Sequence, residues 1–478
     1  MNLDTLLASY PEPRPVDPDR IAELVREAGR VLIVLDDDPT GTQSVADLPV
    51  LSGWTPADFE WAFDSGAPAV YVLTNSRSFD PETAARINRE VVTGAVSAAR
   101  ARGIRVAFAS RGDSTLRGHF PLEPDTIAET LAELGEKRPD GVLLVPAFPD
   151  AGRITIGGMH GMADGDAFTP VGETEFARDS TFGYRSSLLA DWVEEKTGGD
   201  VSADAVVVLA LDTIRAGADA VADALLAAPA GSVLAADVVV EDDLRQLALG
   251  LEQAEAAGRD YVYRVGPPFV RARIGQEQRP PIEIDDSGAE TAPGGLVVVG
   301  SHVGLTSRQL AHLLAHRPAA IVVELDVPSV LDPATARDTI DAAVARVVEG
   351  IASGDVVFHS SRTLVRTDDP DESLAISRKV SDALVEVVQR TIAARRPRFV
   401  IAKGGITSSD VASRGLQIAR ATVRGSLFPG LVSVWQPADG PAAGIPYIVF
   451  AGNVGGETTL TEAVEKLSIS ASGAPAQG

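Results

Sequence analysis

The stretch V-L-I-V-L-D-D-D-P-T-G, residues 31–41, decides the fold class of this chain. Its first five residues are apolar and are followed by turn formers, which is the pattern of a buried β-strand. Asp36, Asp37 and Asp38 follow at the expected carboxyl end of this strand, where open α/β sheets bind ligands. These acids could take a proton or hold a metal. Alternatively, Asp38 could bond its own backbone in a solvated turn before Pro39, and the stretch alone leaves both readings open.

Strand-like apolar runs alternate with amphipathic stretches from about residue 31 to residue 467. This alternation predicts an α/β protein of two domains, each a mainly parallel sheet flanked by helices. Asp80 and Pro81 provide the cap and the first turn of one predicted helix, which continues to Ala101. The predicted strands cover residues 31–35, 69–73, 106–109, 141–145 and 205–209, and then 296–299, 320–325, 355–358, 399–402 and 447–450.

The alternation fails between Pro267 and Gly295, where Pro, Gly, Asp and Glu dominate. Such composition is typical of a domain boundary. We therefore predict a first domain over residues 1–270, a linker over 271–295, a second domain over 296–467 and a disordered tail over 468–478.

Charge and composition restrict the partners of the 478-residue chain. Its formal net charge is −25, from 42 basic and 67 acidic residues, so the chain repels polyanions and nucleic acid is not expected as a partner. It has no cysteine, which excludes thiolate catalysis, disulfides and cysteine-bound zinc. Neither a membrane-spanning run nor a secretory leader is recognisable, so we expect a cytoplasmic protein without a membrane partner. The residues leave a homodimer open.

Three strands of the second half run directly into glycine-containing turns that precede helices. Free backbone N–H groups at such turns can bind phosphate, although glycine there often serves tight packing alone. None of the turns matches the P-loop or the G-x-G-x-x-G dinucleotide fingerprint. Lys403 could neutralise phosphate charge or be an exposed strand-end lysine. The candidate phosphate-binding residues are Ser301, Lys403, Gly404, Gly405, Thr407, Gly452 and Asn453.

Two loops of the first half place arginine and hydroxyl donors just beyond strand ends. Guanidinium groups grip carboxylates, and amide or hydroxyl side chains read sugar hydroxyls, so these loops suit a small hydroxy acid. Surface salt bridges are the alternative. A third segment, residues 146–161, is predicted to be a rigid irregular loop that serves as a lid or a clamp. The candidate substrate residues are Asn75, Arg77, Asp113, Ser114 and Arg117.

With these motifs in hand, the chain resembles the four-carbon acid sugar kinase family over nearly its whole length. Residues 37–41 are similar to the family's D-D-x-T-G, residues 113–118 to D-S-T-L-R-G, residues 146–153 to P-A-F-P-x-x-G-R, and residues 269–272 to F-V-R-A. In the second half, the three glycine turns resemble G-S-x-S, G-G-E-T-S and K-S-G-N-F-G. The chain departs from these at Val303, Ile406 and Phe450-Ala451, where the family has Ser, Glu and Lys-Ser.

The resemblance implies a sugar-acid-binding first domain and a nucleotide-binding second domain with an active-site cleft between them. Together the two domains are expected to phosphorylate a hydroxyl of a threonate, erythronate or oxo-tetronate with ATP and Mg²⁺. The resemblance adds Arg271 to the substrate residues, and Asp37 or Asp38 is the candidate general base. Two alternatives stay open. The departures in the nucleotide turns are compatible with a non-kinase enzyme that acts on hydroxy acids, and a sugar-acid sensor without turnover is the other.

Overall fold

The computed structural model describes residues 1–283, 293–362 and 370–468, with the side chains of 370–375 left aside. The chain divides into two compact units, Met1–Arg279 and Pro280–Gly478. The main-sheet strands of each unit are mainly parallel and have flanking helices, so the predicted α/β fold class is confirmed. The division falls inside the predicted linker. Apart from Ser468, the predicted tail lies outside the described residues.

The first unit contains eight parallel strands in the order β2-β3-β1-β4-β11-β5-β10-β9. The central strands read as continuous apolar runs because helices cover both faces of a parallel sheet. The strands are β1 (Arg30–Asp36), β2 (Leu48–Leu51), β3 (Ala69–Leu73), β4 (Arg105–Arg111), β5 (Gly141–Val145), β9 (Val207–Leu209), β10 (Ser232–Ala236) and β11 (Tyr261–Val265).

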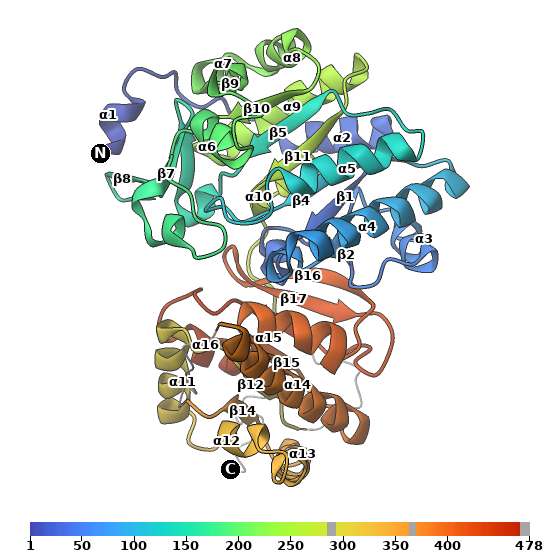
Figure 1. Cartoon of the computed structure of the whole chain (residues 1–478), viewed down its shortest axis with the longest axis vertical. Helices are drawn as coiled ribbons and strands as arrows, with labels where there is room; N and C mark the ends of the chain where they lie inside the picture. Colours follow the sequence, from blue (N-terminus) through green and yellow to red (C-terminus); the bar gives the residue numbers. More distant parts are fainter. Residues whose placement is uncertain (284–292, 363–369, 469–478) are drawn as a thin grey trace, which may run out of the picture. The chain divides into compact units, whose positions relative to one another are not determined.

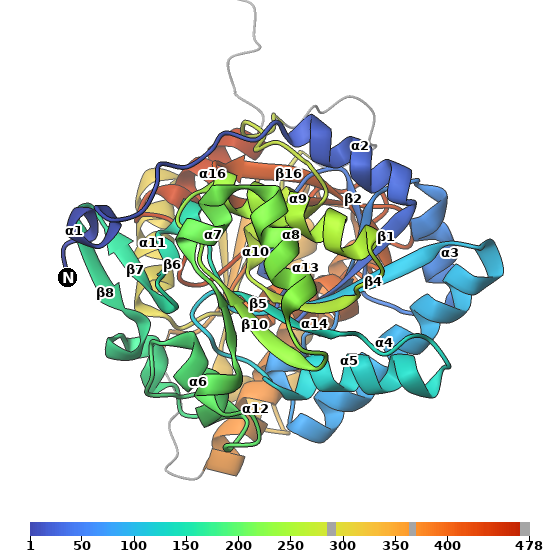
Figure 2. The same ribbon diagram turned by 90° about the horizontal axis from the view of Figure 1, so that it is seen from above.

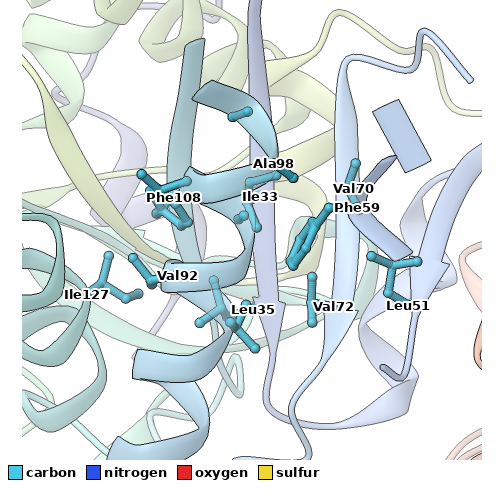
Figure 3. Packing of buried hydrophobic residues seen from close by; sticks show 14 of the residues in the cluster. Ile33, Leu35, Leu51, Phe59, Val70, Val72, Val92, Ala98, Phe108 and Ile127 are labelled. Carbon is cyan, nitrogen blue, oxygen red and sulfur yellow. The ribbon is translucent and has the colours of Figure 1, made fainter. Parts of the chain in front are cut away.

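Helices α3, α4 and α5 close one face of this sheet. Figure 3 shows Ile33 of β1 and Phe108 of β4 directed toward Val92 of α4 and Ile127 of α5, and all four belong to one buried apolar cluster. Helices α4 and α5 lie side by side (Figure 1). The helices of the unit are α1 (Leu3–Leu7), α2 (Pro18–Ala28), α3 (Pro56–Asp64), α4 (Pro81–Arg102), α5 (Leu122–Glu133), α6 (Leu189–Lys196), α7 (Leu211–Ala216), α8 (Ala218–Ala227), α9 (Glu241–Ala256) and α10 (Pro267–Arg273).

Local sequence signals set the helix ends. Helix α4 begins where the Asp80 carboxylate accepts the Thr83 N–H at 2.9 Å, and it ends at Gly103, which adopts a left-handed φ of 66°. The predicted helix after Asp80 is therefore present.

Helices α8 and α9 pack against each other (Figure 2), and α9 also contacts α2 and α10.

The segment predicted as an irregular loop, residues 146–161, is instead largely regular. After a short 3₁₀ turn it forms β6 (Arg153–Ile156) and β7 (Met159–Asp164), which pair antiparallel and are joined by β8 (Ala167–Pro170). Gly157 and Gly158, with φ of 58° and 73°, make the tight connection between β6 and β7. The glycine pair was the hairpin signal that the prediction of an irregular loop missed.

The second unit has strand order β13-β14-β12-β15-β18-β17-β16, in which the first five strands are parallel. Strands β16 and β17 form an antiparallel hairpin on this sheet. The strands are β12 (Leu296–Val299), β13 (Ile321–Leu325), β14 (Val356–Ser360), β15 (Val400–Lys403), β16 (Arg420–Phe428), β17 (Leu431–Pro437) and β18 (Tyr447–Phe450). The helices are α11 (Gly304–His316), α12 (Val327–Leu331), α13 (Ala336–Ile351), α14 (Pro370–Ala394), α15 (Gly405–Asp410) and α16 (Thr459–Leu467).

Candidate functional site

The first candidate site lies at the topological switch point of the first unit. Strand β1 lies between β3 and β4, so the chain moves to opposite sides of β1 as it adds these strands. The crevice outside the carboxyl ends of strands at such a point is where open α/β sheets bind ligands. The carboxyl ends of β1, β3 and β4 lead into residues 37–38, 75–77 and 113–117, and these segments contain the first-half motifs.

Asp37 and Arg77 form a bidentate pair at this point. The Arg77 Nε donates to Asp37 Oδ2 at 3.1 Å, and one terminal nitrogen donates to Oδ1 at 2.7 Å. The Asp37 side chain is 2% exposed, whereas Arg77 is 20% exposed. Both oxygens of Asp37 therefore accept hydrogen bonds from Arg77. The bidentate N–H pair of Arg77 is bound to a protein carboxylate.

Asp38 has a different environment from Asp37. Its Oδ1 accepts the backbone N–H of Thr40 at 2.9 Å and the Thr40 hydroxyl at 2.5 Å, while Oδ2 lies 3.9 Å from Arg77. Burial alone would raise the pKa of Asp38, but the charges of Arg77 and Arg111 and the bonds from Thr40 outweigh it, so the pKa is lowered. Asp38 is an ionised, 22%-exposed carboxylate with one oxygen outside the Thr40 bonds.

Asp36 completes the acidic run but faces inward, where it pairs with Arg111 of β4. Burial raises the pKa of Asp36 to about 7, although Arg111 opposes the rise. Arg111 also donates to the backbone carbonyl of Asp38 and so fixes the turn. A Cβ at Gly41 would lie 2.4–2.5 Å from Arg111 Nε and the Asp36 carboxylate, which explains why this turn requires glycine.

Asp113 and Arg117 lie in the loop after β4. The Arg117 Nε donates to Asp113 at 2.6 Å, and the hydroxyl of Thr115 donates to the same carboxylate. Burial would raise the pKa of Asp113, but Arg77 and Arg117 outweigh it and lower the pKa to about 2. Because the charge of Arg77 acts on Asp37, Asp38 and Asp113 alike, the acids of both motifs surround one guanidinium.

Residues outside the motifs brace this loop. The carbonyl of Ser114 lies 2.8 Å from Nε2 of His160 in β7, and the carbonyl of Thr115 accepts the Tyr184 hydroxyl at 2.6 Å. Burial lowers the pKa of His160 to about 4, so the ring is neutral at pH 7. The β6–β8 sheet therefore supports the loop that carries Asp113.

A buried hydrogen-bond network centred on Glu123 lies behind this loop, and the sequence analysis did not predict it. Glu123 accepts hydrogen bonds from Ser76 at 2.5 Å, from Ser110 at 2.7 Å and from Arg264 of β11 at 2.5 Å. A Cβ at Gly118 would lie 2.7 Å from Arg264, so the last glycine of D-S-T-L-R-G makes room for this arginine. Arg264 lies inside the otherwise apolar strand Y-V-Y-R-V, and a charged residue at such a position indicates a buried partner of opposite charge.

Two further predicted substrate residues have distinct placements. Asn75 adopts a left-handed φ of 52° beside Arg77, and its amide donates to Ser78 at 3.0 Å. Arg271 lies in α10, is 1% exposed, and pairs with Glu241 at 2.6 and 3.0 Å and with Asp150 at 3.0 Å. We therefore give Arg271 a structural role and leave it out of the site.

The second candidate site lies at the switch point of the second unit, where β12 is between β14 and β15. The three glycine turns approach one another closely there. A Cβ at Gly300 would lie 2.4 Å from the Thr407 hydroxyl, one at Gly404 3.0 Å from Ser301 Cβ, and one at Gly452 2.9 Å from the Ser301 hydroxyl. The three turns thus meet around Ser301, and each glycine permits that approach.

Helix α15 follows the second glycine turn directly. It begins at Gly405, one residue after Gly404 with its φ of 129°, so Thr407 lies in the first turn of the helix rather than at its cap. Asn453 is exposed at the third turn. Val303 and Ile406 are 48% and 63% exposed.

Two cationic side chains, Lys403 and Arg362, lie beside the three glycine turns. Lys403 Nζ donates to the Ala451 carbonyl at 2.5 Å and lies 3.8 Å from the centre of the Phe450 ring. Arg362, which the sequence reading missed, donates to the Ser301 carbonyl at 2.8 Å and to the Ser307 hydroxyl at 2.5 Å. Neither forms an ion pair with any carboxylate in the described parts of the chain. Burial lowers the pKa of both cations, that of Lys403 to about 7.

Within residues 1–283, 293–362 and 370–468, no three His, Asp or Glu side chains group as metal ligands. In the same ranges, no helix is long and apolar enough to cross a membrane.

The protein therefore has two candidate sites, each in its own α/β unit. One is lined by acids and arginines, and the other by three glycine turns and two cations. Family models agree with this division. A sugar-binding N-terminal domain matches residues 32–273 and a nucleotide-binding C-terminal domain matches residues 296–460. The chain belongs to the four-carbon acid sugar kinase family.

Individual relatives support the same assignment. A D-erythronate kinase of Heliobacterium modesticaldum is 26% identical over 385 residues, which cover 76% of this chain and 80% of the relative. A solved structure from Salmonella typhimurium LT2 superposes with a TM-score of 0.67 at 18% identity, and covers 92% of this chain and 100% of its own. One from Haemophilus influenzae gives 0.60 at 19% identity, with 91% and 99% covered. These two structures show that the fold is shared.

Proposed function

We propose that this protein transfers the γ-phosphoryl group of ATP to a hydroxyl of a four-carbon sugar acid. The observation that carries the proposal is the pair of cations, Lys403 and Arg362, beside three converging glycine turns in a chain of net charge −25. A buried ammonium without a carboxylate partner is costly, and a bound polyphosphate would compensate it. The likeness to D-erythronate kinase supports the choice of a sugar acid as acceptor.

The departures from the family pattern do not remove the cation from this site. Lys403 and Phe450 are register partners in the parallel pair β15–β18, so their side chains emerge on the same face of the sheet. The ammonium of Lys403 lies over the Phe450 ring. A lysine on β15 therefore supplies positive charge next to the position where the resemblance leads one to expect a lysine on β18. This favours a kinase over the non-kinase alternative.

Asp38 is the proposed base in the first unit. Its Oδ2 lies outside the Thr40 bonds, whereas both oxygens of Asp37 are held by Arg77. The lowered pKa of Asp38 makes it a weak base. A weak base suffices for phosphoryl transfer, because the transition state is loose and the substrate hydroxyl becomes acidic only as its oxygen bonds to phosphorus.

The residues of the second site fit the phosphate groups of a nucleotide. Magnesium in kinases keeps several waters and is held by phosphates with one or two carboxylates, so it needs no cluster of three protein ligands. Bound with the nucleotide, Mg²⁺ supplies charge neutralisation to the phosphates. Lys403 and Arg362 would border the phosphates, and Ser301, Gly404 and Gly452 would line their turns.

A panel of four-carbon acids with Mg-ATP tests the proposal. Coupled detection of ADP, followed by mass analysis of the product, should reveal one or a few acids that become phosphorylated. A product that forms without nucleotide would favour an isomerase or lyase. Tight binding of an acid without any turnover would favour a sensor.

A further inference from the structure

Arg153 is an arginine of the first unit that none of the proposed roles uses. It opens β6, and its backbone exchanges two hydrogen bonds with Phe148, at 2.7 and 3.0 Å. This exchange pins the backbone at the start of the β6–β7 hairpin. Two residues further along β6, the Thr155 hydroxyl lies 2.9 Å from Nδ1 of His160, and Nε2 of that ring lies 2.8 Å from the Ser114 carbonyl. The start of β6 therefore lies against the loop after β4, and the charges of Asp113 and Arg117 in that loop act on the Arg153 guanidinium. Arg153 as a whole residue is half-buried.

Arg153 differs from its neighbours because its guanidinium has no hydrogen-bond partner among the described residues. Arg77 pairs with Asp37, Arg117 with Asp113, and Arg264 with Glu123. By contrast, no oxygen of the described residues bonds the Arg153 guanidinium, and its Nε is buried without an acceptor. Burial lowers the pKa of Arg153, and the attraction of Asp113 does not offset it.

The geometry of the guanidinium group determines which ligand could accept its hydrogen bonds. A guanidinium offers parallel N–H groups that match the two oxygens of a carboxylate. The neighbouring Asp113 carboxylate would repel a dianion more strongly than a monoanion, and it can accept hydrogen bonds from hydroxyl groups. A carboxylate joined to a short polyol therefore matches both charges.

We propose that Arg153 binds the carboxylate of the sugar acid, while Arg77 and Arg117 stay with their protein partners beside the polyol. This inference rests on the proposed function and deepens it, because it assigns one end of the substrate to one residue. Asp113 receives hydroxyl groups of the polyol, and the reacting hydroxyl is directed toward Asp38.

The test compares Arg153→Met and Arg153→Lys with Arg185→Met, a control at an arginine whose side chain is 90% exposed. Calorimetry measures the Kd of the acid, and steady-state assays separate KM from kcat. Loss of one charge-assisted pair predicts an acid Kd about 10- to 100-fold weaker in Arg153→Met, with the KM for ATP unchanged. Lysine keeps the charge but loses the fork, so Arg153→Lys should recover part of the affinity.

A neutral four-carbon polyol distinguishes recognition of the carboxylate from support of the fold. The wild-type protein should prefer the acid, and Arg153→Met should lose that preference while its thermal midpoint stays near that of Arg185→Met. Equal losses for acid and polyol, or an unchanged acid Kd, would overturn the inference. Binding of the acid without phosphorylation by the wild-type protein would reject the kinase proposal alone, because the Kd comparison needs no turnover.

Discussion

At the scale of single residues, neighbouring aspartates of one motif have different environments. Asp36 is buried against Arg111, Asp37 gives both oxygens to Arg77, and Asp38 keeps one oxygen outside its bonds to Thr40. Consecutive strand-end residues point in alternate directions, so adjacent carboxylates meet different partners. Asp38, the proposed general base, is therefore distinguished from Asp36 and Asp37 by its partners and its exposure rather than by its position in the motif.

The first prediction concerns Asp38. Replacement by asparagine keeps the shape and removes the base, so kcat should fall by about 10²- to 10⁴-fold with little change in the Kd of the acid. Steady-state kinetics and calorimetry measure the two quantities. Asp223→Asn, at an exposed acid of α8, is the matched control. An Asp38→Asn enzyme with near-normal kcat would remove Asp38 from the mechanism.

Asp37→Asn should behave differently from Asp38→Asn. It removes one partner of a buried bidentate pair, and such a change typically costs about 3–5 kcal/mol of folding free energy. We expect a lower thermal midpoint and weaker acid binding in addition to slower turnover. A variant that loses kcat alone would identify Asp37 as the base instead.

The pH dependence of nucleotide binding should report Lys403. Its pKa of about 7 means that the ammonium is charged below pH 7 and neutral above it. ATP affinity should therefore weaken as pH rises through about 7, in addition to any change from titration of ATP itself. Lys403→Met should show only the contribution of ATP, and calorimetric Kd values across pH 6–9 compare the two proteins. Parallel pH profiles would contradict this assignment.

At the scale of elements, each site depends on supports from distant parts of the sequence. The D-S-T-L-R-G loop is held by His160 from β7 and by Tyr184. The turn after β12 is held by Arg362, which follows β14. Motif residues thus take their geometry from elements that carry no motif.

Tyr184→Phe tests the support of the D-S-T-L-R-G loop. The change removes only the hydroxyl that donates to Thr115 and leaves a buried carbonyl without its partner, at an expected cost of about 1–3 kcal/mol in the free energy of unfolding. The KM for the acid should rise and that for ATP should not. Thermal denaturation and steady-state kinetics measure both effects. Equal rises in the two KM values would show that Tyr184 does not act locally.

Gly300→Ala tests the convergence of the glycine turns. A Cβ there would lie 2.4 Å from the Thr407 hydroxyl, whereas Gly354→Ala, the control in the same unit, meets open space. Gly300→Ala should weaken ATP binding by more than tenfold through displacement of the turn and leave the Kd of the acid unchanged. Wild-type ATP affinity in Gly300→Ala would show that the turns do not contact the nucleotide.

At the scale of the whole molecule, two units of one architecture use the same location for different chemistry. Each places its site at the carboxyl ends of strands beside a switch point, because only there do loops from neighbouring parallel strands meet. The first unit lines that location with acids and arginines, and the second with glycines and two cations. The two sites therefore differ in the residues of their loops rather than in the architecture of their sheets.

Net charge gives a prediction at this scale. With a formal charge of −25, the molecule repels an anionic acid at long range, and salt screens this repulsion. The association rate constant of the sugar acid should rise as ionic strength increases from about 10 mM to about 150 mM. Stopped-flow measurements can follow it. A rate constant that falls with salt would show that the local cations dominate the encounter.

The sequence by itself determined the fold class, most strands and the family, because apolar period and motif spacing are local properties. Three of the strands that it missed, β11, β16 and β17, have local reasons. Arg264 interrupts the apolar run of β11, and the hairpin β16–β17 alternates polar with apolar residues instead of forming a run. Only the tertiary structure decided which charged residues are free. Partners such as Arg77 and Asp37, forty residues apart, meet through strand order. The sequence therefore does not reveal that, among the described residues, the Arg153 guanidinium and the Lys403 ammonium have no carboxylate partner.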